Sequence, residues 1–494
     1  MCKTGFIKII SLDIFSKVRL NQVVIMLTYT LQKNSSDPLY ISLYKCLRND
    51  IRSGVLHAGE RLPSKRAFAV NLGISVITVE NAYERLCDEG YVFSMPKRGY
   101  YVGDLKEIRQ THEVASEVKV IAKKDVSTGK LLADFSSNEC DPEAFPFSVW
   151  SHLLRQVLNE RRNQLLMNSP GSGLWELREA IAQHLKAYHG MEVLPEQVVI
   201  GAGTEYLMGR LIELLGFDLT YASEDPGYER IAWIFKSHGV KHLGISLDEF
   251  GLSERELELT DAQVVHISPS HQFPTGIVMP VSRRYELLGW ASAKKGHYII
   301  EDDYDSEYRI TGRPLSTLQS IDAEGKVIYM NTFTKTLAST MRVSYMVLPL
   351  KLCASFEKKL SFYSCTVSNF EQYALAAFLK SGAFETHLNR MRRLLARKRD
   401  TLLSLIEKSK LNAKSMIENQ SNGLHFLLRV DTEFSDDECV QRALSYGVKI
   451  VPLSKFRRLG KRDEHAFVIG YSAVKLDDMP QAVKALEHAL LTPA

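Results

Sequence analysis

From residue 131 onward, short apolar runs alternate with longer amphipathic segments, and this alternation restricts the folds that the chain can adopt. The runs "QVVIGAG", "VVHISPS", "HYIIEDDY", "VIYMNTF" and "YMVLPL" have the length of buried strands, and helical patterns such as the one from Ser282 lie between them. This pattern predicts a mainly parallel sheet covered by helices, the architecture of an α/β fold. From about Asn369, a long basic helix and the strands "HFLLRV", "VKIVPL" and "AFVIGYS" predict a smaller α+β lobe.

Residues 36–102 carry the local signals of a second, smaller unit. An amphipathic helix is predicted first, from apolar residues at helical spacing. Ser64 and Ser75 are typical N-cap residues of two further short helices, and Gly73 stands at the turn between them. The segment "YVFSMPKRGYYVG" alternates apolar residues around a Pro-Lys-Arg-Gly tip, which predicts a hairpin. Helix, turn, helix and hairpin in this order predict a winged helix-turn-helix.

Two segments lack these signals. Residues 103–131 are polar without an apolar period, and we interpret them as a linker. Residues 1–35 are interpreted as an N-terminal extension, in which Met26 is an alternative start; its apolar part is interrupted by charges and is followed by no small-residue cleavage site. Its longest charge-free stretch is too short to span a bilayer. The predicted domains are therefore the winged helix at 36–102 and a large domain at 132–494.

The composition narrows the class of protein further. With 45% hydrophobic and 24% charged residues, the chain has ordinary globular composition. The net charge of +4 is too small for a binder that engages nucleic acid over its whole surface, so such a contact must be local. Seven cysteines lie far apart without metal-ligand spacing, which favours reduced thiols in a cytosolic protein without a metal site.

The helix that begins at Ser75 is the predicted recognition helix, because the N-terminal residues of this element contact base edges in the major groove of double-stranded DNA. Basic residues precede it, and the basic hairpin tip is placed to enter a minor groove or to hold phosphates. The alternative is a set of solvated surface charges, which the order of the elements disfavours. The predicted DNA-binding residues are Lys65, Arg66, Ser75, Thr78, Lys97, Arg98 and Gly99.

Four motifs of the large domain each supply groups that pyridoxal 5'-phosphate requires. This cofactor takes a lysine for its imine, a carboxylate for its pyridine nitrogen, a hydroxyl for its ring oxygen, and a helix N-terminus with an arginine for its phosphate. The motifs are "GAGTE", "DPGYER", "EDDYD" and "NTFTK". Each of them alone is a weak signal; "EDDYD", for example, also fits an acidic loop or a metal site. All of them, however, follow strands, where open α/β sheets bind ligands. The predicted cofactor-binding residues are Lys335, Asp302, Tyr304, Arg342, Thr332, Thr334, Gly203, Thr204, Glu205 and Tyr228.

Both parts of the chain resemble one known family. "LPSKRAFAVNLGISVITVENAYERLCDEGYVFSMPKRGYYV" resembles the winged helix of GntR-type bacterial regulators, with Val76 where an arginine usually follows the serine. "SPGSGLWELREAIAQHL", "SPSHQFPTGIVMPVSRRYELL", "IIEDDYDSEY" and "NTFTKTLASTMRVSY" resemble the aminotransferase-like domain, pyridoxal-phosphate fold type I, of MocR/GabR-type regulators. That family is known for regulating vitamin B6 or γ-aminobutyrate genes. The resemblance implies that Lys335 is the Schiff-base lysine, that Arg230 binds the carboxylate of an effector, and that the chain forms a head-to-tail homodimer. His271 is a further predicted effector-binding residue.

Three departures separate the chain from true aminotransferases of this fold. Phe273 replaces the asparagine of "NPTG" that hydrogen-bonds the ring oxygen, and Ser270 or His271 is the candidate substitute. Val468 stands where such enzymes carry the arginine that clamps the substrate carboxylate, and Asn168 stands near the place of a partner-subunit tyrosine that holds the phosphate. These departures weaken the case for efficient transamination while leaving cofactor binding intact.

We therefore expect a DNA-binding transcription regulator of the bacterial cytosol that senses pyridoxal phosphate, an amine or an amino acid, and that is not an enzyme, although residual transamination stays open. The alternative is a functional aminotransferase with an attached DNA-binding domain. A third hypothesis is a binding scaffold that has lost the cofactor.

Overall fold

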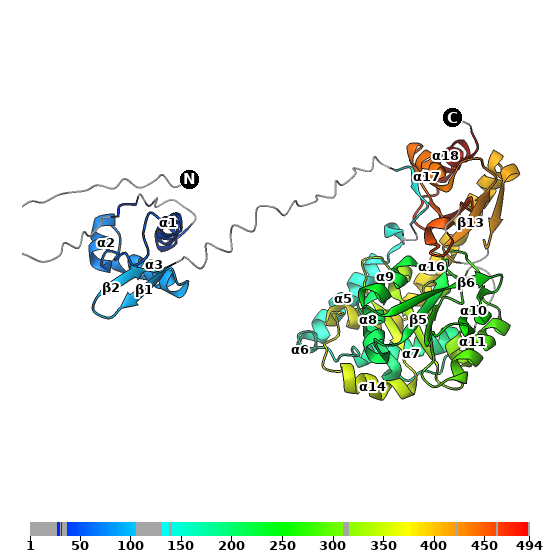
Figure 1. The fold of residues 1–494 in the computed structure, drawn as a ribbon, viewed down its shortest axis with the longest axis horizontal. Helices are drawn as coiled ribbons and strands as arrows, with labels where there is room; N and C mark the ends of the chain where they lie inside the picture. Colours follow the sequence, from blue (N-terminus) through cyan, green and yellow to red (C-terminus); the bar gives the residue numbers. More distant parts are fainter. Residues whose placement is uncertain are drawn as a thin grey trace, which may run out of the picture. The chain divides into compact units, whose positions relative to one another are not determined.

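The computed structural model describes residues 27–29, 31, 37–104, 131–137, 141–309, 316–420, 423–460 and 463–492. The chain divides into two compact units, Met1–Val126 and Ser127–Ala494 (Figure 1). Most of the predicted extension and most of the predicted linker lie outside the described residues. Among the described helices, none is long and apolar enough to cross a membrane.

The N-terminal unit is the predicted winged helix-turn-helix. Ser64 and Ser75 cap its second and third helices by accepting the amides of Ala67 and Thr78, and Gly73 between them has a left-handed φ of 65°. The sequence predictions of both caps and of the turn are thus confirmed. The elements are α1 (Leu39–Ser53), α2 (Lys65–Leu72), α3 (Val76–Asp88) and the antiparallel strands β1 (Val92–Met95) and β2 (Gly99–Val102).

A short segment before α1 packs on this unit. The ring of Tyr29 lies 6.2 Å from the ring of Phe68, and its hydroxyl donates a hydrogen bond of 2.5 Å to Asp50. Asn71 donates its side-chain amide to the carbonyl of Leu27 at 2.7 Å. The segment around residues 27–29 is therefore held by both α1 and α2.

The second unit is built on a mainly parallel sheet of eight strands, as the alternating pattern predicts. β11 runs antiparallel between β10 and β4, and β7 runs antiparallel to β6 at the other edge. The sequence pattern did not predict β6, because few of its residues are fully buried. In spatial order the strands are β4 (Val198–Gly201), β11 (Ser344–Val347), β10 (Val327–Thr332), β9 (Tyr298–Asp302), β8 (Val264–Ile267), β5 (Thr220–Asp225), β6 (Lys241–Asp248) and β7 (Gly251–Leu252).

Helices cover both faces of this sheet. Successive residues of a strand point to opposite faces, so Ile300 packs with α8, α9 and α14 while Ile299 packs on the other side. The first face carries α8 (Thr204–Leu215), α9 (Glu229–Ser237) and α14 (Leu350–Leu360); the other carries α7 (Trp175–His189), α10 (Glu254–Glu258), α11 (Val281–Ala293), α12 (Leu318–Ile321) and α15 (Asn369–Lys380). Three more helices of this body are α5 (Phe147–Glu160), α6 (Arg162–Leu165) and α13 (Phe333–Thr336).

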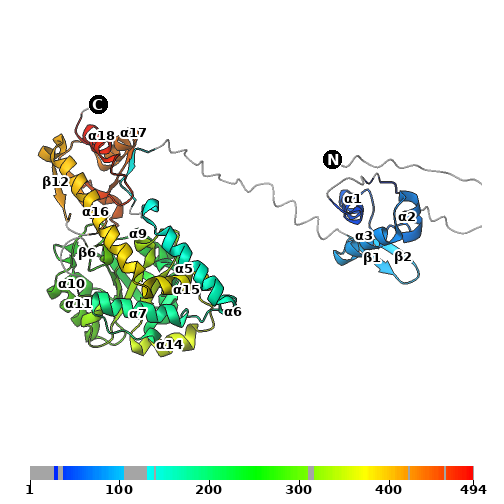
Figure 2. The same ribbon diagram turned by 180° about the vertical axis from the view of Figure 1, so that it is seen from behind.

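The C-terminal part forms the predicted α+β lobe (Figure 2). The predicted long basic helix is α16 (Ala383–Glu407), which Gly382, with a left-handed φ of 75°, separates from α15. The lobe comprises the antiparallel strands β12 (Ser415–Glu418), β13 (His425–Val430), β16 (Ala466–Gly470) and β15 (Val451–Pro452), the pair β14 (Val448–Lys449) and β3 (Ala133–Asp134), and the helices α17 (Asp436–Ser445) and α18 (Met479–Leu491).

Candidate functional site

The predicted site residues of the large domain lie at the carboxyl ends of neighbouring strands. Asp302 is the last residue of β9 and Thr332 the last residue of β10, and these two strands are parallel neighbours. Gly201 ends β4, and α8 begins three residues later. Asp302 has the same orientation as Ile300, so it faces the side of the sheet that α8 covers. The topology therefore brings the acidic strand end to the same side as the start of α8.

The start of α8 forms a cradle against an arginine. Gly203, the N-cap residue, has a φ of 96°, and a Cβ built on it would lie 2.5 Å from Nη2 of Arg342. A side chain at position 203 would thus displace the guanidinium. The amide of Gly203 donates to the carbonyl of Gly201 at 2.9 Å, whereas the first amides of a helix have no partners within it. Thr204 and Glu205 therefore supply the amides of this N-terminus, and the amide of Gly203, which was predicted to join them, shapes the turn instead.

The side-chain carboxylate of Glu205 binds two arginines. Oε1 accepts a hydrogen bond of 2.8 Å from Arg230, and Oε2 accepts one from Arg342. Partial burial opposes the charge of Glu205, but the hydrogen bonds and charges of the two arginines outweigh it and lower the pKa of this carboxyl. Two residues that were assigned to different ligands, Arg342 to a phosphate and Arg230 to an effector, thus share one carboxylate.

Asp302 and Tyr304 each have a histidine neighbour. Oδ2 of Asp302 lies 3.3 Å from Nε2 of His266, which extends from the adjacent strand β8. The Tyr304 hydroxyl lies 3.2 Å from Nδ1 of His271, and that nitrogen lies 2.9 Å from the buried Asp305. Burial, reinforced by the surrounding carboxylates, raises the pKa of Tyr304 well above its usual value, so its hydroxyl stays protonated.

Lys335 lies in α13, directly after β10, and it is near the histidines of the site. The pKa of His425 is well below its usual value, first because of burial and then because of the charges of His271 and Lys335. His425 therefore stays neutral, and its Nε2 donates to the carbonyl of Pro274 at 3.1 Å. The predicted lysine and the Tyr304–His271 pair are thereby placed around one histidine of β13.

The two threonines before and beside Lys335 have partners within the lysine loop. Thr332 caps α13 by accepting the amide of Thr334 at 3.1 Å, and it accepts a hydrogen bond of 2.7 Å from the Ser344 hydroxyl. The Thr334 hydroxyl donates to the carbonyl of Met341 at 3.2 Å. In this structure, both hydroxyls shape the loop that carries Lys335.

Tyr228 lies at the start of α9 within an aromatic cluster. Its ring meets the ring of Phe273 edge-on at 5.8 Å, and Phe273 packs in turn against Phe456 at 5.1 Å and His425 at 5.3 Å. Val468, in β16, belongs to the apolar cluster against which Phe273 and Phe456 pack. Two of the positions that depart from aminotransferases therefore share one apolar environment.

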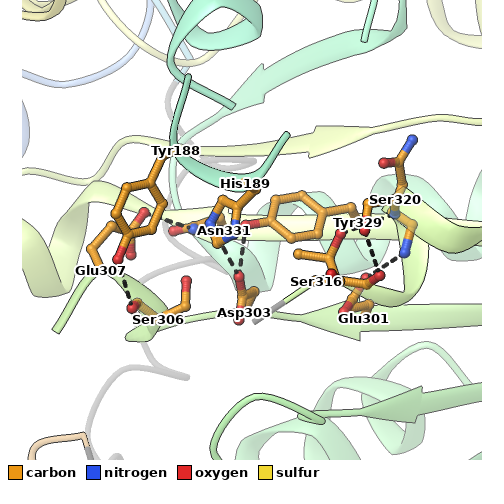
Figure 3. Close-up of polar contacts among 12 residues, drawn as sticks. Tyr188, His189, Glu301, Asp303, Ser306, Glu307, Ser316, Ser320, Tyr329 and Asn331 are labelled. Carbon is orange, nitrogen blue, oxygen red and sulfur yellow. Dashed lines mark hydrogen bonds and ion pairs between the residues drawn. The ribbon is translucent and has the colours of Figure 1, made fainter. Parts of the chain in front are cut away.

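A buried polar network stabilises the opposite face of the strand ends (Figure 3). Asp303 accepts the Tyr329 hydroxyl at 2.9 Å, and Glu307 accepts the side-chain amide of Asn331 at 3.0 Å. Burial raises the pKa of Glu307 to about 8 and that of Glu301, which accepts two backbone amides near α12, to about 7. The residues on both sides of Asp302 are thus anchored, which holds its carboxylate on the α8 face.

The predicted DNA-binding residues gather on one unit. Ser75 caps α3 and Thr78 lies in its first turn, where the two hydroxyl oxygens are 2.8 Å apart, and Arg66 is exposed in α2. Lys65 forms an ion pair with Glu80 of α3, so it also joins the two helices.

The tip of the wing lies between β1 and β2. Lys97 has a left-handed φ of 59°, and Gly99 follows Arg98 with a φ of 109°. A Cβ at Gly99 would lie 3.4 Å from Nε of Arg61. Arg61 therefore adds a positive charge beside the wing that the sequence did not indicate.

Three residues beside the candidate site were also missed in the sequence. His266 lies in the predicted strand "VVHISPS", but only the parallel pairing of β8 with β9 brings it to Asp302. His425 and Phe456 come from the C-terminal lobe, far along the chain from the motifs they touch. Their contacts are tertiary, and spacing in the sequence carries no signal for them.

Asn168, which stands near the place of a partner-subunit tyrosine in aminotransferases, is exposed after α6.

The fold and the site define a DNA-binding transcription regulator whose large domain has the fold of pyridoxal-phosphate aminotransferases. The model of the aminotransferase class I and II family matches residues 132–486, and that of the gntR family of bacterial regulatory proteins matches residues 39–102. The chain belongs to the MocR/GabR family of regulators, in which these two domains are fused.

Similar proteins support this assignment over nearly the whole length. An uncharacterized HTH-type transcriptional regulator of Bacillus subtilis, YdeL, is 35% identical, with 94% of this chain and 99% of YdeL covered. The probable rhizopine catabolism regulatory protein MocR of Rhizobium meliloti is 31% identical, with 93% and 95% covered. Among solved structures, an archaeal alanine:glyoxylate aminotransferase superposes with a TM-score of 0.66 at 25% identity, over 73% of this chain and 91% of that enzyme.

Proposed function

We propose that this regulator senses pyridoxal 5'-phosphate, alone or with an amine or amino acid, through Lys335 and the groups around it. One observation carries the proposal: the cradle formed by Gly203 and Arg342 lies on the same side of the sheet as the carboxylate of Asp302. This cofactor requires an anion site for its phosphate and a carboxylate partner for its protonated ring nitrogen.

The residues present fit the cofactor. The guanidinium of Arg342, which approaches the turn because Gly203 has no side chain, and the first amides of α8 suit a phosphate. Asp302 would pair with the pyridine nitrogen, and Tyr304 would donate to the ring oxygen. When bound, the cofactor supplies an aldehyde that forms a reversible covalent bond with amines. Lys335 is the amine of this chain that follows the end of β10, next to Asp302 on β9.

The protein's own residues hold the site ready for such a ligand. His266 and the network around Asp303 keep the Asp302 carboxylate in place. Engagement of Lys335 changes the charge beside His425, and hence the electrostatics of β13 in the C-terminal lobe. A charge change of this kind shifts a two-state equilibrium of the regulator only if the ligand binds the two states differently. A tenfold difference corresponds to about 1.4 kcal/mol, which one charge change at such a site is able to supply.

The sensor role is favoured over steady transamination by the aromatic cluster. Phe273 and Val468 contribute apolar surface where catalytic members of this fold carry an asparagine and an arginine, and Phe273 contacts Phe456 and His425 instead. We therefore propose that Lys335 acts as a receptor, and that any transamination is a side reaction. Turnover measured with amino-acid and keto-acid pairs separates the two functions, since steady multiple turnovers would establish the enzyme.

We also propose that the regulator works as a homodimer on double-stranded DNA in the bacterial cytosol. Leu166, Met167 and Phe362 are exposed apolar side chains of the large domain, and exposed apolar surface of this kind commonly marks an interface between proteins. Mass determination by light scattering is the test, with a monomer at micromolar concentration as the contrary result. A head-to-tail arrangement is the one that the family resemblance implies.

The decisive experiment on the sensor is a gel-shift titration on the chain's own upstream region, with and without pyridoxal phosphate. Wild type is expected to change its DNA affinity with the cofactor, and Lys335→Ala is expected to lose most of that response. Borohydride should trap an adduct at Lys335 of the wild type. Cofactor-insensitive DNA binding by both proteins would refute the sensor mechanism, and absence of an adduct would favour a scaffold that has lost the cofactor.

A further inference from the structure

The first turn of the recognition helix presents apolar side chains to solvent. Val76 is 40% exposed and Ile77 is 67% exposed, although both are β-branched hydrophobic residues. The core of the winged helix is formed by other residues of α3, among them Val79, Ala82 and Tyr83. Val76 and Ile77 do not belong to that core.

The polar groups of the same turn are already engaged with one another. Ser75 accepts the amide of Thr78 at 3.1 Å, and the hydroxyl oxygens of these two residues lie 2.8 Å apart. Glu80, in the next turn, pairs with Lys65. One hydroxyl hydrogen of the Ser75–Thr78 pair stays free to donate, and the exposed side chains beside this pair are the hydrocarbon groups of Val76 and Ile77.

Polar side chains continue the outward face, and Asn81 is the first of them. Asn81 lies four residues after Ile77, which places it on the same face one turn further along α3, and it is exposed. In the major groove, apolar side chains contact the C5-methyl group of thymine, and asparagine pairs with the N6 and N7 edge of adenine. Guanine, by contrast, is read mainly by arginine or lysine, and neither occurs from Ser75 to Glu84.

We propose that α3 recognises A·T base pairs in the major groove, with thymine methyl groups packed against Val76 and Ile77 and an adenine edge bound by Asn81. The exposed side chains of Arg66, Lys97 and Arg98 contact DNA phosphates and do not contribute to sequence specificity. This inference rests on the chain being a DNA-binding regulator, and it is independent of the cofactor proposed above.

Removing the thymine methyl groups from the DNA tests the inference directly. Full-length protein is used to select duplexes from a random pool, and the enriched duplex is then synthesised with thymine or with uracil, which pairs identically but lacks the methyl group. Wild type is expected to enrich A·T pairs in each half-site and to lose about fourfold in affinity for every contacted methyl removed. Binding is measured by fluorescence anisotropy at fixed salt, because phosphate contacts make affinity salt-dependent.

Two variants and a matched control complete the test. For Ile77→Ala, replacing thymine by uracil at the base pair that residue 77 contacts should hardly change the affinity for the duplex. Val76→Arg should enrich a guanine in place of a thymine. Val70→Ala removes a valine of α2 that is 83% exposed, and it should keep the full thymine preference. The inference is overturned if wild type binds both duplexes equally, enriches G·C pairs at the contacted positions, or enriches no sequence. None of these results depends on pyridoxal phosphate, so the sensor proposal is tested separately.

Discussion

Replacing Glu205 with glutamine should strengthen phosphate binding at the start of α8. The carboxylate of Glu205 is bound to both Arg230 and Arg342, so an incoming phosphate competes with it for the same positive charges. Glutamine keeps the size of the side chain and its place in the helix but removes the negative charge. The carboxylate of Glu205 is thus expected to weaken the affinity of the site for an anion.

The size of the effect follows from two contributions. Each half-exposed ion pair of Glu205 is worth about 0.2–1 kcal/mol, and part of this is lost when the phosphate takes over the arginines. Repulsion between the carboxylate and a dianion roughly 5 Å away adds about 1–2 kcal/mol in a water-like dielectric. Since 1.4 kcal/mol is a factor of ten, Glu205→Gln should bind about tenfold more tightly.

The assay separates phosphate binding from covalent binding. Pyridoxal phosphate and inorganic phosphate are titrated by calorimetry into Lys335→Ala and into Lys335→Ala with Glu205→Gln. Glu213→Gln is the matched control, because Glu213 lies at the other end of α8 and pairs with Arg210 at 2.8 Å. Weaker binding by the Glu205 variant would refute the reasoning and show that this carboxylate positions Arg342 for the ligand. Equal affinity of the two proteins for phosphate would also refute the reasoning, because the carboxylate of Glu205 would then leave the arginines without a loss of binding free energy.

Three further predictions test other parts of the structure. Gly203→Ala should abolish phosphate binding, because the new Cβ would meet Arg342, and it should destabilise the domain by about 1–2 kcal/mol, because φ at this position is 96°. Calorimetry measures the phosphate affinity, and thermal unfolding measures the stability. An unchanged affinity would contradict the cradle. The folded-state pKa of Glu307 is raised to about 8, so the folded state binds more protons than the unfolded state between about pH 4.5 and 8. Stability should therefore fall as pH rises through this window, and Glu307→Gln should flatten the fall in the melting temperature; a variant with the wild-type slope would assign the pH dependence to other groups. Arg98→Ala, at the wing tip, should weaken binding to all duplexes alike and reduce the salt slope by about one, whereas an altered sequence preference would show that Arg98 contacts bases.

The winged helix and the strand ends of the large domain were predictable from local sequence. Ser64, Gly73 and Ser75 specify caps and a turn within a few residues, and the structure places each as predicted. The strands before Asp302 and Lys335 were predictable because short apolar runs that alternate with helical segments indicate buried strands. Such signals are short-range, so they survive without knowledge of the fold.

Contacts between distant segments were decided only by the tertiary structure. Nothing in the spacing of Glu205, Arg230 and Arg342 indicates that one carboxylate binds both arginines, because this requires β4, β11 and the start of α9 to meet around the same point. The pairing of His266 with Asp302 likewise depends on which strands are neighbours. The sequence by itself determined which chemical groups end the strands. The order of the strands in the sheet decided which of those groups touch, because side-chain partners are set by spatial neighbours and not by separation along the chain.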